Sequence, residues 1–97
     1  MAKDANIEEM RKLVADFLDM ELEKVTANAK IMADLGADSL DAADLIGEME
    51  TAYDCEIPDK YAVKILTAQD AYEYVNDPDA YKKKCDEQGY KGAGEFA

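Results

Sequence analysis

The amino-acid sequence predicts an all-α protein, a small four-helix bundle of three main helices and one short helix, with a possible extra C-terminal helix. Three segments repeat apolar residues at the spacing of a helix that buries one face. Each follows a residue typical of a helix N-cap, namely Asn6, Asp38 and Thr67. The 97 residues are enough for one modest core, and a deep enzyme pocket in addition is not expected.

The first helix is predicted from Ile7 to Met20. Asn6 is followed three residues later by Glu9, as in a capping box. A long loop, residues 21–38, should follow, because the apolar pattern weakens there. Ile31 and Leu35 are expected to hold this loop over the core.

The second helix is predicted from Ser39 to Tyr53, with Asp38 as its N-cap and Asp41 near its third position. Helical spacing places five residues on its core face: Ala42, Leu45, Ile46, Met49 and Tyr53. Acidic side chains on the opposite face repel one another by roughly 0.2–0.5 kcal/mol per pair. Gly47 costs the helix about 1 kcal/mol more.

A short third helix is predicted from about Asp59 to Lys64, after a proline-containing break. The fourth helix should begin after Thr67, where Asp70 completes a second capping-box pattern. It should end near Asn76, because Pro78 follows two residues later.

The chain is predicted to divide into a helical domain, residues 1–76, and a C-terminal extension, residues 77–97. A fifth helix from Pro78 to Gln88 has proline at its first position and Gly89 as a stop. Its apolar residues are few, so the sequence leaves open whether this helix docks or frays. The last nine residues, GYKGAGEFA, are small and glycine-rich and are predicted to be disordered.

Composition excludes several functions. With 23 acidic and 11 basic residues the chain has a net charge of −12, which argues against nucleic acid as a partner and for basic protein surfaces. Histidine is absent, so the chain cannot form a Ser-His or Cys-His pair or a histidine metal site. We therefore expect a non-catalytic protein.

The two cysteines, Cys55 and Cys85, are too few and too far apart to predict a disulfide framework. No signal-peptide pattern and no run of transmembrane length is present in the sequence. We expect a cytoplasmic monomer that does not insert into a membrane.

Between Ile31 and Asp59 the sequence has nine acidic residues and no lysine or arginine. We interpret this stretch as a recognition surface for a basic partner, although ordinary solubility is the simpler alternative. Weak divalent-cation binding stays open. An EF-hand is excluded, because a loop starting at Asp34 would place Ser39 where glycine is required.

Ser39 is the only serine in the chain, and it lies where a glycine-containing turn meets a predicted helix. Free N–H groups and the dipole at a helix N-terminus favour a phosphate there. Four aspartates crowd the same place: Asp34, Asp38, Asp41 and Asp44. They disfavour a free anion, so a phosphate at Ser39 should be covalently attached.

The string DLGADSLD at residues 34–41, followed by DCEIPD at residues 54–59, resembles the acyl carrier protein family of fatty-acid and polyketide synthesis. The resemblance spans roughly Ile7 to Asn76. It implies that a phosphopantetheinyl transferase attaches the 4′-phosphopantetheine of coenzyme A to Ser39. The thiol of this arm would carry acyl groups as thioesters, and the helices would part to admit the acyl chain.

The resemblance also implies a docking surface for the transferase and for fatty-acid or polyketide synthesis enzymes. Its predicted residues are Asp38, Leu40, Asp41, Asp44, Glu48, Glu50, Glu56 and Asp59. Two alternatives stay open, an unmodified interaction adaptor and a carrier of aminoacyl or peptidyl cargo. An enzyme built on a carboxylate pair is poorly supported, because the sequence suggests no apolar pocket to shift carboxylate pKa values.

Overall fold

A computed structural model describes residues 6–97, and the predicted helical bundle is confirmed. The described elements are α1 (Ile7–Leu18), the 3-10 helix η1 (Leu22–Lys24), α2 (Ser39–Tyr53), α3 (Asp59–Ala62), α4 (Ala68–Asn76), α5 (Pro78–Gln88), β1 (Tyr90–Gly92) and β2 (Glu95–Phe96). The two strands pair antiparallel as a small hairpin at the C-terminus.

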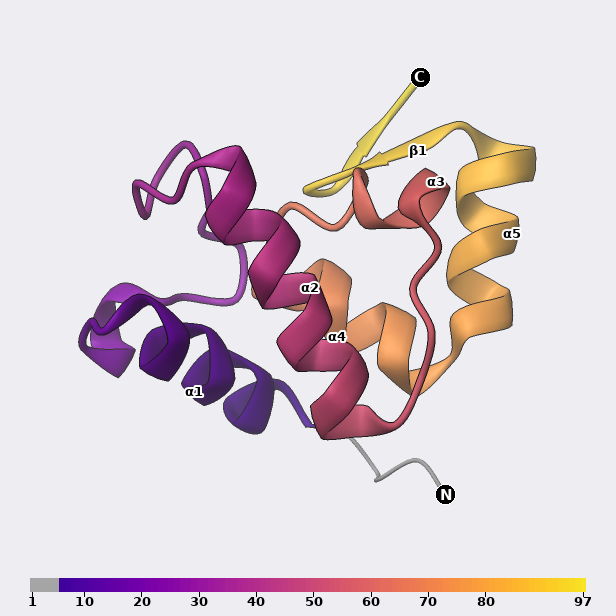
Figure 1. The fold of residues 1–97 in the computed structure, drawn as a ribbon. Helices are drawn as coiled ribbons and strands as arrows, with labels where there is room; N and C mark the ends of the chain where they lie inside the picture. The colour runs from indigo at the N-terminus through magenta and orange to yellow at the C-terminus, as the bar shows by residue number, and fades with distance from the viewer. Residues whose placement is uncertain (1–5) are drawn as a thin grey trace.

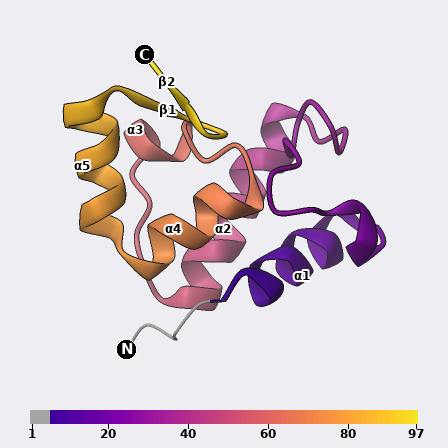
Figure 2. The same cartoon turned by 180° about the vertical axis from the view of Figure 1, so that it is seen from behind.

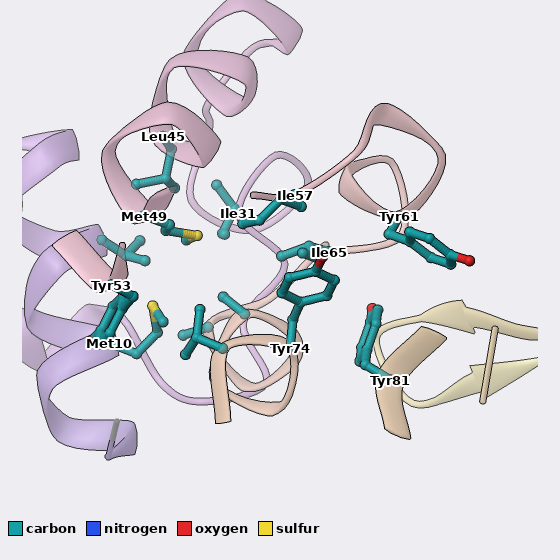
Figure 3. Packing of buried hydrophobic residues seen from close by; sticks show 14 of the residues in the cluster. Met10, Ile31, Leu45, Met49, Tyr53, Ile57, Tyr61, Ile65, Tyr74 and Tyr81 are labelled. Carbon is teal, nitrogen blue, oxygen red and sulfur yellow. The ribbon is translucent and has the colours of Figure 1, made fainter. Parts of the chain in front are cut away.

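The helices are arranged around α4. In two opposite views α1 and α5 lie on opposite sides of α4, while α2 crosses it (Figures 1 and 2). Leu45 and Met49 of α2 share one buried cluster with Met10 of α1 and Tyr74 of α4 (Figure 3). Tyr81 of α5 belongs to the same cluster, so a single core joins all the main helices.

The first capping box is confirmed. The Asn6 side chain accepts a hydrogen bond from the Glu9 N–H at 2.8 Å and donates one to the Glu9 carboxylate at 3.0 Å. The end of α1 differs from the prediction: the helix stops at Leu18, because Asp19 adopts a left-handed conformation with φ +54°.

The long loop is confirmed, and Ile31 holds it as predicted. Ile31 is buried, and its N–H donates to the Leu66 carbonyl at 2.9 Å. Leu35 is half-buried and packs against the same core, also as predicted. Arg11 of α1 donates to the carbonyls of Val25 at 2.6 Å and Leu22 at 3.1 Å. A charged donor on α1 therefore fixes the start of the loop.

The prediction of disorder for the last nine residues is wrong. The hairpin β1–β2 forms there, and Tyr90 is only 3% exposed. The helix α5 has the predicted limits and docks through Tyr81 and Cys85. The chain beyond residue 76 therefore shares the core of the helices before it. The division at residue 76 stays a prediction.

Buried tyrosines make stability sensitive to alkali. Burial is the largest cause that raises the pKa of Tyr74 from 10.0 to about 12, and burial also raises the pKa of Tyr53. The folded chain holds these protons more tightly than the unfolded chain, so their contribution is complete below the unfolded pKa of about 10 and is lost as the pH rises through the folded pKa. We expect the urea midpoint to fall as the pH rises from about 10 toward 12.

The variant Tyr74→Phe should show a shallower fall than the wild type over the same range, because one raised pKa is gone. Equal slopes in the two proteins would show that Tyr74 makes no contribution to the alkaline loss of stability.

Candidate functional site

The loop before Ser39 has a fixed conformation. The Asp34 carboxylate accepts a hydrogen bond from the Lys30 N–H at 2.8 Å, and the N–H of buried Ala37 donates to the Ile31 carbonyl at 3.2 Å. Gly36 turns the chain with φ +81°, a conformation that favours glycine. These contacts therefore fix the direction in which the chain enters α2.

A reciprocal capping box begins α2 and confirms the predicted roles of Asp38 and Asp41. The Asp38 carboxylate accepts from the Asp41 N–H at 2.8 Å, and the Asp41 carboxylate accepts from the Asp38 N–H at 3.2 Å. Ser39 becomes the first helical residue, and its side chain is exposed. The box thus presents the hydroxyl at the helix N-terminus.

The cap should make a measurable contribution to the free energy of unfolding. We expect Asp38→Ala to lower the free energy of unfolding by about 1 kcal/mol in urea denaturation, whereas Asp38→Asn, which keeps an acceptor oxygen, should lose much less. Asp44→Ala, on the same helix and exposed, should change it by less than about 0.5 kcal/mol. Equal losses in Asp38→Ala and Asp44→Ala would contradict the capping role.

The helix N-terminus fits a covalently attached phosphate. The N–H groups of Ser39 and Leu40 have no hydrogen-bond acceptor in the described part of the chain, while the next two N–H groups are taken by Asp38. These two free donors and the helix dipole would face a phosphodiester on the Ser39 oxygen. No lysine or arginine occurs between residues 31 and 59, so within this stretch the two N–H groups and the dipole compensate its charge.

An apolar cavity of about 730 Å³ opens beside Ser39. Its apolar walls come from the loop, from α2 and from the segment around α3, and include Ile31, Met32, Leu45, Ile46, Met49, Ile57, Val63, Ile65 and Leu66. Ser39 and Glu50 both line it, and the rise of the helix over these eleven positions is about 16 Å. The cavity therefore extends from the serine along about three turns of α2.

The predicted docking residues do not all lie alike. Five of the acids are exposed, namely Asp38, Asp44, Glu48, Glu56 and Asp59, whereas Asp41 is half-buried. Leu40 is 69% exposed beside Ser39. Glu50 is half-buried, and its carboxylate accepts from the Ile57 N–H at 2.8 Å, so it holds the segment before α3.

Three of these acids border two different hollows of the surface. Glu48 borders a groove between α1 and α2, while Glu50 and Asp59 border the cavity. Over residues 6–97 no cluster of acids and cysteines is arranged to hold a metal ion, and no helix is long and apolar enough to cross a membrane.

The comparisons with known proteins agree with this geometry. A family model described as the phosphopantetheine attachment site matches residues 8–75, more than half of the chain. A solved structure of the acyl carrier protein from Enterococcus faecalis, described for components that contribute to its high thermal stability, is similar with a TM-score of 0.62 and 31% identity. The match covers 72% of this chain and 89% of that chain. The chain belongs to the acyl carrier protein family.

Membership of the acyl carrier protein family gives the chain a carrier role and a covalent 4′-phosphopantetheine cofactor. Carrier domains of this family are generally non-catalytic and interact with transferases and synthases. The matched residues end at residue 75, so α5 and the hairpin lie outside the family match.

Asp70 is the structural residue that the sequence analysis assigned incompletely. Its N–H donates to Thr67 Oγ1 at 3.1 Å as predicted. Its carboxylate, however, does not complete the box: it is fully buried and accepts from the N–H groups of Leu66 at 3.0 Å and Ala93 at 2.7 Å and from the Tyr90 hydroxyl. The available signal was its helical spacing from Tyr74, which places an acid toward the core.

Lys30 is the other residue that sequence analysis passed over. It is the one base in the described lining of the cavity. Its position just before the base-free stretch was visible in the sequence, but the cavity was not, because the cavity is formed by segments far apart in the chain.

Proposed function

We propose that Ser39 is the residue to which a phosphopantetheinyl transferase attaches the 4′-phosphopantetheine arm. The observation that carries this proposal is the position of the chain's only serine, exposed at the first residue of α2 inside the family match. The free N–H groups of Ser39 and Leu40 support it further.

The base for this step must come from the transferase. The Ser39 oxygen forms a bond to the phosphorus of coenzyme A that carries the arm, the bond from that phosphorus to the adenosine bisphosphate breaks, and the serine proton passes to a base. The chain has no histidine, and Asp38 and Asp41 each use a carboxylate oxygen in the capping box. This site therefore presents a hydroxyl and does not activate it.

We further propose that the cargo is an acyl chain carried for fatty-acid or polyketide synthesis. The support is the cavity beside Ser39, whose walls are mostly apolar. An aminoacyl or peptidyl cargo would bring polar groups against these walls, at a cost of about 1–3 kcal/mol for each group left unpaired. The lining therefore favours a hydrocarbon chain.

The proposed docking surface combines Leu40 with the exposed acids around Ser39. Leu40 offers an apolar contact beside the attachment site, and Asp44 and Glu48 add negative charge on the same helix. Transferases and synthesis enzymes with basic docking surfaces would associate faster through this field. We also propose a cytoplasmic monomer, because the two cysteines are unbridged and one core buries the apolar faces of the main helices.

Charge reversal tests this surface. We expect Glu48→Lys to reduce the association rate with a phosphopantetheinyl transferase by about tenfold at low salt, and the difference from wild type to shrink as salt rises. Asp79→Lys, an exposed acid on α5 with the same change in net charge, should have a much smaller effect. Equal losses would assign the effect to net charge and not to this surface.

The proposed function is tested by incubating the purified protein with coenzyme A and a phosphopantetheinyl transferase. The mass should rise by one phosphopantetheine group. If the mass stays unchanged with several competent transferases while the protein still binds a basic partner, the chain is an unmodified adaptor.

A further inference from the structure

One wall of the cavity has two distinct sides. The segment from Tyr61 to Leu66 lines the cavity through Ala62, Val63, Ile65 and Leu66. From its other side it bonds to the C-terminal extension, which lies outside the family match. The two views also place the hairpin beside α3 (Figures 1 and 2).

The extension contacts the backbone of this wall directly. The Tyr81 hydroxyl donates to the Lys64 carbonyl at 2.9 Å. Gly92 has φ +96°, and a Cβ at this position would lie 2.0 Å from the Lys64 carbonyl oxygen. The backbone of the hairpin is therefore packed against the wall as closely as a glycine permits.

Both ends of the wall are held as well. At one end the Tyr61 hydroxyl donates to the Asp86 carboxylate of α5 at 2.5 Å. At the other end the Leu66 N–H donates to Asp70, whose buried carboxylate also accepts from the hairpin. The side-chain hydrogen bonds and ion pairs that join residues 77–97 to the rest of the described chain all end within residues 60–73.

The extension thus braces one wall of the cavity and leaves the walls from α2 and the loop without such bonds. A cargo that fits the resting cavity leaves the brace intact. A longer chain needs more volume. An outward shift of the wall would press Lys64 against the Tyr81 hydroxyl and the backbone of Gly92, which already lie in close contact with it, so the wall cannot move unless the extension moves too.

We propose that the C-terminal extension sets the cargo specificity of this carrier by limiting how far the Tyr61–Leu66 wall can move. This inference rests on the proposed function, because it requires a cargo attached at Ser39. The specificity-determining contacts are the Tyr81 hydroxyl, the close approach of Gly92 and the Asp70 carboxylate.

The experiment compares wild type with Tyr81→Phe, which removes one hydroxyl and keeps the ring. Tyr72→Phe is the matched control, because Tyr72 lies on α4 and its hydroxyl has no hydrogen-bond partner in the described part of the chain. Deletion of residues 77–97 is avoided, since it would leave the Asp70 carboxylate short of two donors. Both substitutions are measured without cargo and after loading with butanoyl, octanoyl and hexadecanoyl phosphopantetheine, with loading checked by mass.

Without cargo, Tyr81→Phe should speed amide hydrogen exchange at Val63, Lys64 and Ile65 by about fivefold, the factor that corresponds to one hydrogen bond of about 1 kcal/mol. After loading, each protein should have one acyl chain length that raises its thermal midpoint most. This preferred length should be longer in Tyr81→Phe than in wild type. Tyr72→Phe should match wild type in both measurements.

Three results would overturn the inference alone: unchanged exchange in Tyr81→Phe, faster exchange with an unchanged chain-length preference, or the same changes in Tyr72→Phe. If neither wild type nor either variant can be loaded with cargo, the proposed function is refuted. The mass measurement would show this before any thermal midpoint is compared.

Discussion

Replacing Ser39 with alanine is expected to abolish the mass gain on incubation with coenzyme A and a phosphopantetheinyl transferase. The phosphodiester needs an oxygen, and the chain has no second serine to supply one. The capping box of α2 is made by Asp38 and Asp41, so the helix should form unchanged in the variant. The measurement is intact mass after incubation, with helicity followed by circular dichroism.

Thr51→Ala provides the matched control. It removes another exposed hydroxyl from the same helix, one that donates to the Gly47 carbonyl at 3.1 Å. This variant should load like wild type. A full mass gain in Ser39→Ala would assign the attachment to another residue.

Replacing Asp70 with alanine is expected to destabilise the fold more than any surface change, by roughly 3–5 kcal/mol. The carboxylate accepts three hydrogen bonds in a fully buried position. Its loss would leave the Leu66 N–H and the buried Tyr90 hydroxyl without an acceptor and would detach the hairpin from α4. Urea denaturation gives the free energy of unfolding.

The control is Asp79→Asn, an exposed aspartate on α5, for which a change within about 0.5 kcal/mol is expected. Tyr90→Phe should give an intermediate loss, because the Asp70 carboxylate would keep its two N–H donors. If Asp70→Ala is as stable as Asp79→Asn, then the buried carboxylate does not hold the C-terminal extension.

Local signals in the sequence predicted the helices well where a typical capping residue marks the boundary. The start of α2 and both limits of α5 were predicted correctly, because Asp38, Pro78 and Gly89 are local signals at these boundaries. The end of α1 was missed by two residues. It depends on a left-handed aspartate, Asp19, where glycine is the usual signal.

Long-range contacts account for what the sequence did not predict. The glycine-rich end suggested disorder, yet Gly89, Gly92 and Gly94 have positive φ angles that shape a hairpin. That hairpin is ordered by Asp70, which precedes Tyr90 by twenty positions. The cavity likewise combines the loop, α2 and the segment around α3, which no local pattern relates.

The candidate site was predicted more completely than the fold around it. The position of Ser39 and the caps of α2 follow from a short stretch of sequence and were confirmed in the structure. For the acidic surface, the sequence predicted which residues are acidic but not which of them are exposed. The packing of the chain determines which carboxylates are exposed. One oxygen of Glu50, for example, accepts a hydrogen bond from the Ile57 N–H and is not free for a partner.

The most direct test of the carrier function is the intact mass of the protein recovered from its natural host while that host is making fatty acids or polyketides. We expect a population heavier by one phosphopantetheine group, with fragmentation placing the added mass on Ser39. Protein recovered only in its unmodified form under these conditions would contradict the carrier function.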